Sequence, residues 1–412
     1  MLFGNIYLEA SHVLKKVAIV GAGLTRFSGS RQDASQEELV AEAMRHATAD
    51  MGTTWSDLRN EVDMGIGVYC SDFFNQQLMF GATVQDYFGL CPKPNIRVEA
   101  VGATGGQGIR TALAYIGAST LYDVVVVLSW EKMSEVSYSQ SLDFLGRNLD
   151  LDFEYYPIGV TIPTIHGMMA RMHAKKFGTT REQMAKIAVK NTRNAMNNPF
   201  VEFGRELGVD DVLNSKPLFS PLNELDFARA SDGAAVLVIA SEEKARKFTD
   251  TPIWISGTGC GTDKLFLRRS AEEIPTLTST SVAAKQAYAM AGIGDPMKEL
   301  NCAEVYDMST IYEILAYESL GLCGSGEGGK LIDEGLTQRD GSLPVNVGGG
   351  CFGAGTALGP IGVKQAVEMF WQLRDEADKH MKGSVQVKGA EKGLIHAESG
   401  YGVYSVVHVL ER

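Results

Sequence analysis

Short apolar runs alternate along the chain with longer segments in which apolar residues recur at helical spacing. The first run covers Val17 to Val20, and a nearly continuous one covers Val124 to Leu128. Strands without polar alternation are typical of a sheet that is buried on both faces between layers of helices. The pattern therefore predicts an α/β fold.

The same order of elements occurs twice along the chain. In each half an apolar strand runs into a Gly-x-Gly turn, a second strand ends in a polar or aromatic cluster, a glycine-rich segment opens a helix, and an apolar strand closes the unit. These features lie first at 17–23, 65–69, 102–108 and 124–128, and again at 253–259, 303–306, 348–355 and 403–410. Four features in the same order favour a duplication over an ordinary doubly wound sheet with chance glycine runs.

The predicted architecture is a five-layered αβαβα duplication. Residues 1–14 form an extension ahead of the first strand, residues 15–250 form the first half, and residues 251–412 form the second half. The first half carries an inserted loop region over 131–250, which includes a helical stretch from Ile165 to Phe177.

Composition restricts the function. The net charge of −12 argues against nucleic acid as a partner, although a local basic patch can still bind a phosphate-bearing small molecule. The six cysteines are scattered without a CxxC pair, which is typical of a reduced cytosolic protein and gives no zinc site. No stretch is long and apolar enough to span a membrane, and the first residues lack the pattern of a signal peptide. We expect a cytoplasmic protein without a metal.

The segment Gly21-Ala-Gly23 invites comparison with the dinucleotide-binding fingerprint GxGxxG. Arg26 stands where that fingerprint needs its third glycine. We interpret the segment as a tight strand-to-loop turn and expect no nicotinamide cofactor.

A second glycine-rich segment, Glu99-Ala-Val-Gly-Ala-Thr-Gly-Gly106, leads from a strand into a helix. Backbone N–H groups and the helix dipole at such a helix start favour a developing oxyanion. The segment resembles the thiolase superfamily, specifically sterol-carrier-protein-type thiolases and archaeal acetyl-CoA acetyltransferases, which read Glu-Ala-x-Cys-Ala-Ser-Gly-Gly. Gly102 stands in place of the cysteine that forms the acyl-enzyme, and Thr104 in place of the serine.

The resemblance extends from Val17 to the end of the chain. Further matching stretches are Asn197-Asn-Pro199, Ala230-Ser-Asp-Gly-Ala-Ala235, Tyr317-Glu-Ser-Leu-Gly-Leu-Cys323, Gly326-Glu-Gly-Gly329 and Pro344-Val-Asn346. It implies the thiolase fold and an acyl-CoA substrate, with CoA as part of the substrate and no separate cofactor.

The departures from the family pattern are systematic. Tyr306 replaces the histidine of the His-Asp-Cys-Phe motif, and Thr356 replaces the activating histidine of Gly-His-Pro. The last Cys-x-Gly turn corresponds to the region around Gly400, without a cysteine but with His396 beside it. Losing the nucleophile and its base together is coherent, because neither serves covalent acyl transfer without the other.

Tyr306 is the replacement that suggests a different reaction. A phenol, with an ordinary pKa near 10, acts as a general acid or base when its environment lowers that value. The residue also resembles a tyrosine of thiolase-like steroid side-chain retro-aldolases, which cleave a β-hydroxyacyl-CoA without an acyl-enzyme; a second tyrosine of those enzymes is Thr356 here. The alternative is a core tyrosine satisfied by one hydrogen bond.

Other candidate residues each carry an alternative structural role. Cys351 lies at a helix start that can lower a thiol pKa, so it is either a displaced nucleophile or a packing residue. His166 lies in the insertion that by resemblance covers the pantetheine arm of CoA, so it is a candidate CoA contact or base, or else a structural histidine. Ser256 and Gly257 are further candidate CoA contacts. Arg268 and Arg269 follow the loop at these two residues, and are either CoA phosphate contacts or a solvated basic pair.

The insertion is rich in aromatic residues. Phe144, Phe153, Tyr155 and Tyr156 lie close to Gly146 and Pro157, a composition that suits a mobile cover over an apolar acyl group. The alternative is a loop that packs on its neighbour. We favour a bulky acyl group, aromatic or polycyclic, over acetyl.

Three hypotheses follow for the function. The favoured one is retro-aldol cleavage of an acyl-CoA, with the thioester oxygen held at the Gly102 helix start and the Gly400 turn. The second is thiolytic acyl transfer with Cys351 or another group as nucleophile. The third is a non-catalytic acyl-CoA-binding or scaffold subunit. By resemblance we expect a homodimer that pairs through the strand after the elbow, and a possible separate zinc-ribbon/OB-fold subunit.

Overall fold

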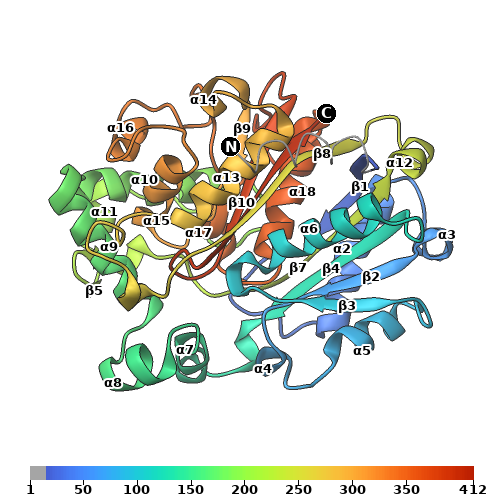
Figure 1. Cartoon of the computed structure of the whole chain (residues 1–412), viewed down its shortest axis with the longest axis horizontal. Coiled ribbons are helices and arrows are strands. Elements are labelled where there is room, and N and C mark those ends of the chain that lie inside the picture. Colours follow the sequence, from blue (N-terminus) through green and yellow to red (C-terminus); the bar gives the residue numbers. More distant parts are fainter. Residues whose placement is uncertain (1–14) are drawn as a thin grey trace.

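A computed structural model describes residues 15–412, so the predicted extension at 1–14 lies outside the described residues. Its central feature is a nine-stranded mixed sheet in the order β3-β2-β4-β7-β1-β8-β11-β10-β9 (Figure 1). The strands are β1 (Val17–Leu24), β2 (Met64–Val68), β3 (Asn95–Val98), β4 (Val124–Lys132), β7 (Asp232–Ser241), β8 (Ile253–Thr262), β9 (Cys302–Glu304), β10 (Lys392–Glu398) and β11 (Tyr404–Glu411).

Strand pairing follows the same plan in both halves, as the duplication predicts. In the first half β2 pairs in parallel with β3 and β4, while β7 is antiparallel to β4 and β1. In the second half β9 is parallel to β10, and β11 is antiparallel to β10 and β8. A parallel bridge between Ala303 and Val345 stands where β3 stands in the first half.

The two halves meet at the first strand of each. Ala18 and Ile19 of β1 pair with β8, which makes the two half-sheets continuous. Two helices, α6 (Thr104–Ala118) and α18 (Ile361–Leu373), pack against each other on the inner side (Figure 1). A Cβ on Gly105 would lie 2.7 Å from the Cα of Gly362, so the backbones of the two helices touch.

The outer faces of the sheet carry their own helices. α2 (Gln36–Asp50) covers β1 and β7, and α13 (Thr278–Ala291) covers β8 and β11. Along β4, Val125 and Val127 belong to the inner core, whereas Val124 and Val126 belong to the outer core beneath α2. The strand is therefore apolar on both faces, and the five-layered α/β architecture predicted from the sequence is confirmed.

The remaining helices connect these layers. They are α3 (Trp55–Glu61), α4 (Asp72–Asn75), α5 (Phe80–Tyr87), α12 (Glu242–Phe248), α14 (Pro296–Glu299), α15 (Thr310–Ser319), α16 (Gly328–Asp333), α17 (Gly350–Ala354) and α19 (Ala377–His380), with the 3-10 helices η1 (Val101–Ala103), η2 (Met133–Glu135), η4 (Glu224–Asp226) and η5 (Phe266–Arg268).

The two Gly-x-Gly segments are not turns, and this prediction was wrong. β1 runs through Gly21 and Gly23, and β8 runs through Gly257 and Gly259. A Cβ on Gly23 would lie 2.2 Å from a carbonyl oxygen of α2, and one on Gly259 would lie 1.9 Å from the carbonyl oxygen of Ala283. These glycines let an outer helix lie directly on its strand.

The predicted insertion contains one element that belongs to the sheet. β7 lies within 131–250 yet pairs with both β1 and β4, so the chain leaves the sheet only between β4 and β7. That excursion holds α7 (Tyr138–Gly146), the π-helix η3 (Leu151–Tyr155), α8 (Tyr156–Ile158), α9 (Ile162–Phe177), α10 (Arg181–Ala195), α11 (Val209–Leu213), β5 (Pro217–Phe219) and β6 (Leu222–Asn223). The predicted helical stretch corresponds to α9.

The strand after the elbow cannot pair two copies of this chain. That strand is β4, which is bonded to β2 on one side and to β7 on the other. The free edge in this half belongs to β3, which precedes the elbow.

In the part of the chain that the structure describes, every helix is too short or too polar to cross a membrane.

We predict that Gly259→Ala lowers the unfolding free energy by about 3 kcal/mol, because the new methyl group would push α13 off the sheet. Thermal unfolding of the purified protein measures the effect. Gly29→Ala is the matched control, since its Cβ would meet only the Phe203 ring at 3.6 Å. Equal melting temperatures for the two variants would contradict the close packing.

Candidate active site

The elbow between β3 and α6 is held in a strained conformation by its own side chains. Val101 has a φ of 50°, a left-handed conformation that β-branched residues rarely adopt. Its N–H donates to Glu99 at 2.7 Å, and the N–H of Ala100 donates to the buried Thr104 hydroxyl at 2.8 Å. Such strain persists only where the surroundings fix it, and it is typical of functional sites.

Gly102 and Tyr306 occupy one space at this elbow. A Cβ on Gly102 would lie 2.6 Å from the Tyr306 hydroxyl oxygen and 2.3 Å from the main-chain oxygen of Glu398. A cysteine at position 102 is therefore incompatible with Tyr306 as it stands. The structure brings these two predicted site residues into direct contact, one from each half of the chain.

Tyr306 is fully buried, and its hydroxyl has no hydrogen-bond partner among the described residues. Burial raises its pKa well above 10, and negative charge on nearby thiol and carboxyl groups raises the pKa further. The expectation that its surroundings lower this pKa was wrong. The phenol keeps its proton at neutral pH, and it is not the core tyrosine satisfied by one hydrogen bond that we set as the alternative.

The Gly400 turn contacts His166 of the insertion. Gly400 has a φ of 54°, and its carbonyl oxygen lies 2.8 Å from Nε2 of His166, which is fully buried. Burial lowers the pKa of His166 to about 4, so the ring is neutral at neutral pH. The structure thus places His166 against the predicted oxyanion turn.

His396 and Thr356 are held by other groups. His396 is buried on β10, with Nε2 at 3.0 Å from the Glu398 carboxylate and 3.1 Å from the Thr280 hydroxyl of α13. The Thr356 hydroxyl donates to the carbonyl oxygen of Arg229 at 3.2 Å. Neither contact reaches Gly102.

Cys351 lies inside the protein rather than at an activating helix start. Its side chain is 1% exposed, and its N–H donates to Asp307 at 2.6 Å. Burial and the nearby Asp307 charge raise the pKa of the thiol well above its usual value. The expected lowering of this pKa was wrong, because α17 is only one turn long and completely buried.

The two arginines predicted to contact the CoA phosphates, Arg268 and Arg269, have different surroundings in the structure. Arg269 is buried, donates to the carbonyl oxygen of Gly402 at 3.1 Å and pairs with Asp263, so it does not face solvent. Arg268 is exposed and pairs with Asp150 at 3.0 Å. Ser256 and Gly257 lie inside β8 and form no loop.

A pocket of about 590 Å³ opens beside the elbow. Its wall includes Val101, Cys70 and Ser399, which adjoin the Gly102–Tyr306 contact, together with Phe144 and Leu145 of α7. The Phe144 ring stacks on Phe73 with centroids 4.7 Å apart.

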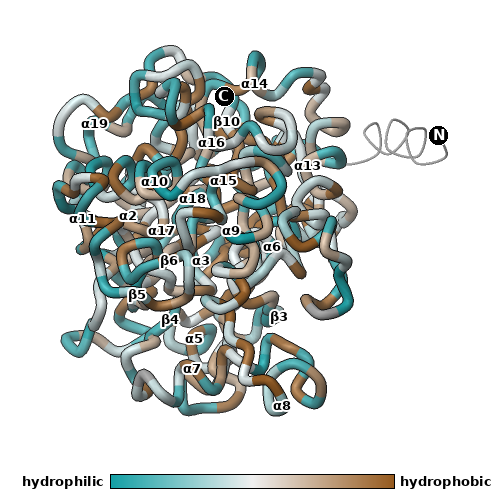
Figure 2. Tube along the Cα trace, turned by 90° about the vertical axis from the view of Figure 1, so that its left-hand side faces the viewer, coloured by the Kyte–Doolittle hydropathy of each residue, from teal (hydrophilic) through white to brown (hydrophobic). Residues whose placement is uncertain are grey.

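The other aromatic residues of the insertion take different places. Phe153 of η3 and Tyr156 of α8 are 71% and 64% exposed. The helix α8 lies at the lower end of the molecule in Figure 2. Tyr155 donates to Asp143 at 3.0 Å. The predicted aromatic cover therefore reduces to Phe144.

A second pocket, of about 550 Å³, also includes a residue of α7, Leu142, in its wall. It carries three cations, Arg205, Lys216 and Arg229, none of which forms an ion pair within residues 15–412. Burial and the positive charge of Arg229 lower the pKa of Arg205. Such an unpaired group is typical of an anion site. Its members are spread over 25 positions of the insertion, so no local motif revealed them.

Comparison with known proteins places this site in a family. Residues 17–243 match the thiolase N-terminal domain, and residues 266–412 match the thiolase C-terminal domain-like family. The chain belongs to the thiolase superfamily. Its resemblance to that superfamily, first inferred from the elbow motif, is confirmed.

Three relatives illustrate the range of activities in this superfamily. The chain is 37% identical to an acetyl-CoA acetyltransferase of Methanothermobacter thermautotrophicus, over 97% of this chain and 100% of that one. It is 30% identical to sterol carrier protein 2 of Rattus norvegicus, over 96% of this chain and 71% of that one. The solved "Ltp2-ChsH2(DUF35) aldolase" matches with a TM-score of 0.78 and 26% identity, over 97% of this chain and 98% of that one. The chain is thus a thiolase-like enzyme of acyl-CoA carbon–carbon chemistry.

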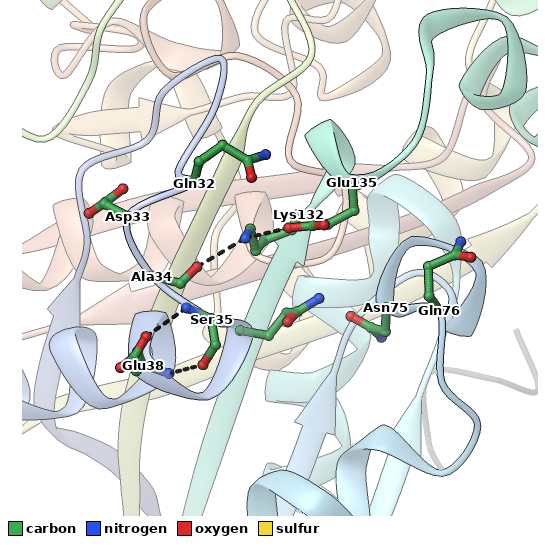
Figure 3. Close-up of a pocket in the computed structure, with 10 residues that line it drawn as sticks. Gln32, Asp33, Ala34, Ser35, Glu38, Asn75, Gln76, Lys132 and Glu135 are labelled. Atoms are coloured by element: carbon green, nitrogen blue, oxygen red, sulfur yellow. Dashed lines mark hydrogen bonds and ion pairs between the residues drawn. The ribbon is translucent and has the colours of Figure 1, made fainter.

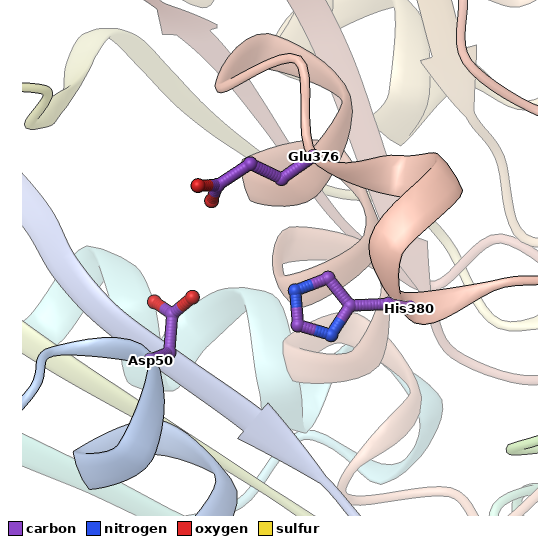
Figure 4. Close-up of side chains that lie close together, drawn as sticks. All are labelled: Asp50, Glu376 and His380. Carbon is purple, nitrogen blue, oxygen red and sulfur yellow. The ribbon is translucent and has the colours of Figure 1, made fainter.

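Two further groups of polar side chains in this thiolase-like chain are already neutralised. At a shallow pocket near the start of α2, Lys132 donates to the carbonyl oxygen of Ala34 and pairs with Glu135 (Figure 3). Asp50, Glu376 and His380 lie close enough to share a cation (Figure 4). Arg374, however, pairs with Asp50 at 3.3 Å and with Glu376 at 2.9 Å, so we assign no metal there.

A buried carboxyl group supports the floor of the pocket beside the elbow. Glu131 is fully buried on β4, and its Oε2 accepts from the N–H groups of Cys70 at 2.8 Å and Gly359 at 3.3 Å. Burial raises its pKa to about 8. Glu131 could not be identified from the sequence, because a single acidic residue at the end of an apolar strand carries no pattern.

The raised pKa of Glu131 predicts a pH-dependent stability difference. The folded chain keeps this proton where the unfolded chain, near the ordinary value of 4.5, has lost it. The stabilisation that comes from this retained proton is fully present below the pKa of Glu131 in the unfolded chain. It is lost as the pH rises through the folded-state pKa of about 8. The Glu131→Gln variant cannot ionise at this position. We therefore expect its unfolding free energy relative to the parent protein to rise from pH 5 to pH 9, by roughly 1.4 kcal/mol per pH unit at most, and its melting temperature relative to the parent to rise with it.

The control for this measurement is Glu243→Gln, at an exposed residue paired with Lys247 whose pKa is lowered rather than raised. Its stability difference from the parent stays flat over the same pH range. A flat profile for Glu131→Gln as well would show that Glu131 is ionised in the folded protein at neutral pH.

Proposed function

We propose that this chain makes and breaks the carbon–carbon bond between the α- and β-carbons of a β-hydroxyacyl-CoA by aldol chemistry, with retro-aldol cleavage as the favoured reaction. The observation that carries the proposal is the contact between Gly102 and the Tyr306 hydroxyl. An acid–base group stands where a covalent acyl-enzyme would have to form.

The proposed cleavage step has one proton donor and one enolate. The phenol of Tyr306 first loses its proton to water. The bond between the α- and β-carbons then breaks, its electron pair passes to the α-carbon, and the β-hydroxyl becomes a carbonyl as its proton moves to the Tyr306 phenolate oxygen. The enolate takes a proton from water to give the released acyl-CoA. Backbone N–H groups at the Gly102 helix start and the Gly400 turn hold the enolate oxygen of the thioester. In the bond-forming direction Tyr306 returns the proton to the β-oxygen.

The raised pKa of Tyr306 fits this step in a specific way. The resting phenol carries the proton, so it is poised to donate to a β-carbonyl oxygen during addition. In cleavage the phenol must first give its proton to water, and the high pKa then makes the phenolate a strong acceptor of the β-hydroxyl proton. The buried hydroxyl has no competing protein partner among the described residues, which leaves it free for the β-oxygen.

The two pockets suit the two ends of the substrate. We assign the CoA phosphates to Arg205, Lys216 and Arg229, in place of Arg268 and Arg269. The acyl group fits the pocket beside the elbow, where Phe144 forms part of the wall. A volume of about 590 Å³ and an aromatic wall favour a bulky, ring-containing acyl group over acetyl.

The alternative of thiolytic acyl transfer has support only from the names of relatives such as the acetyl-CoA acetyltransferase. It requires a thiolate near the elbow. Burial raises the pKa of both Cys351 and Cys70, so each sulfur holds its proton at neutral pH. A non-catalytic acyl-CoA-binding or scaffold role would leave the strained Val101 and the unpartnered Tyr306 hydroxyl without a purpose.

We propose partners on two grounds. The free edge of β3 offers unpaired backbone groups to a second copy of the chain, which would form the homodimer. The similar aldolase is named as a complex with a DUF35 chain, which supports a separate zinc-ribbon/OB-fold subunit for this protein.

Tyr306→Phe tests the proposed function. Loss of the proton donor should lower the turnover of ring-containing β-hydroxyacyl-CoA thioesters by about 100-fold or more. Calorimetric binding of CoA should stay unchanged, since the hydroxyl does not contact the cation pocket. Tyr288→Phe, which removes the hydroxyl of a partly buried tyrosine bonded to the carbonyl oxygen of Leu320, is the matched control and keeps its activity. Full activity in Tyr306→Phe would refute the proposal.

The cation pocket gives an independent prediction. Arg205→Gln and Arg229→Gln should each weaken CoA binding by about 10-fold, and the salt dependence of binding should decrease. Arg246→Gln, at an exposed arginine paired with Glu242, serves as the control for loss of one positive charge. If Arg268→Gln weakens binding and Arg205→Gln does not, the phosphates bind where the sequence first suggested.

A further inference from the structure

His166 packs against two aromatic rings in the interior of the protein. Its ring stacks on Tyr312 of α15 with centroids 4.8 Å apart and planes 21° from parallel. On the other side Phe227, which lines the cation pocket, lies with its centroid at 6.3 Å and 16° from parallel. This packing fixes the orientation of an imidazole that is fully buried.

The hydrogen bond of His166 determines its tautomer. A carbonyl oxygen only accepts, so Nε2, at 2.8 Å from the Gly400 oxygen, must carry the proton. Nδ1 then has a lone pair and no proton, and it has no partner within the described residues. The Nε2–H group of His166 therefore donates to the carbonyl oxygen of Gly400, and this hydrogen bond occupies it.

The contact continues from Tyr312 to the proposed proton donor. The Tyr312 ring meets the Tyr306 ring edge to face, with centroids 6.3 Å apart and planes at 76°. Aromatic pairs of this geometry are stabilising beyond their buried area. One chain of contacts thus joins Gly400, His166, Tyr312 and Tyr306.

We infer that His166 and Tyr312 are positioning residues, which hold the Gly400 turn and the Tyr306 hydroxyl at a fixed separation on either side of the reacting carbons. The inference rests on the proposed function, in which these two groups act on the thioester oxygen and the β-oxygen of one substrate. It replaces the earlier hypotheses that His166 is a base or a CoA contact. An error of about 1 Å in such an arrangement costs roughly 100-fold in rate.

Four variants of the full-length protein test this positioning. His166→Leu removes the donor, whereas His166→Gln keeps an amide N–H near the place of Nε2. Tyr312→Leu removes the ring, whereas Tyr312→Phe keeps it. Turnover of ring-containing β-hydroxyacyl-CoA thioesters, calorimetric binding of CoA and melting temperature are measured for each.

We expect His166→Leu and Tyr312→Leu to lower kcat by about 100-fold, with KM and CoA binding within about threefold of the parent. His166→Gln and Tyr312→Phe should each recover at least about tenfold of that loss. The pH dependence of kcat should keep its shape in His166→Gln, because a positioning residue does not titrate in the reaction. If either leucine variant fails to fold, the conservative variant compared with the parent still carries the test.

His173 provides the matched control on the same helix. It is also fully buried in α9, and it contacts Thr179 at 2.8 Å and Glu318 at 3.1 Å, with no contact to the Gly400 turn. His173→Leu should lower the melting temperature while leaving kcat unchanged. An equal loss of kcat in His173→Leu would mean that any cavity in α9 impairs the enzyme, and would overturn the inference.

Two other outcomes would also overturn it. If His166→Gln is as inactive as His166→Leu and loses one limb of the pH–rate profile, His166 is a base. If the variants weaken CoA binding at unchanged kcat, His166 contacts the CoA arm. The proposed function fails separately, when Tyr306→Phe keeps full activity, whatever the His166 variants do.

Discussion

The backbones of α6 and α18 touch at Gly105 and Gly362, and the position of every group in the site depends on this contact. α6 begins directly after the elbow, so its depth between the two halves of the sheet fixes where Gly102 lies. A larger residue at either glycine would separate the halves and withdraw the elbow from Tyr306 and Glu398, which come from the second half. The site is composite, and its geometry is set by helix packing three residues away from Gly102.

Glycines also allow close packing between helices and strands on the outer faces of the sheet. Gly23 and Gly259 allow α2 and α13 to lie directly on the first strand of each half. The outer helices thus cover the central strands β1 and β8, and these two strands also join the halves. The excursion between β4 and β7 supplies α7, which contributes to both pockets.

Much of the fold could be predicted from the sequence, because apolar runs and glycine-rich helix starts are local patterns that repeat in order. The duplication, the central strands and the elbow at Gly102 follow from such patterns. The glycines of β1 and β8 were misread as turns, since only the helix above them shows why they lack side chains. The sequence could name Tyr306 but not the direction of its pKa shift, which depends on burial by distant segments. The cations at 205, 216 and 229 meet only after folding, and no spacing rule connects them.

The double obstruction at Gly102 has a consequence for any redesign of the site. Both a phenol oxygen and a main-chain carbonyl oxygen, that of Glu398, stand where a side chain would begin. A single mutation to cysteine would meet both, and a backbone shift would be needed as well as a smaller residue at 306. A covalent nucleophile therefore cannot be introduced at this elbow by one substitution, because the obstruction comes from the other half of the chain.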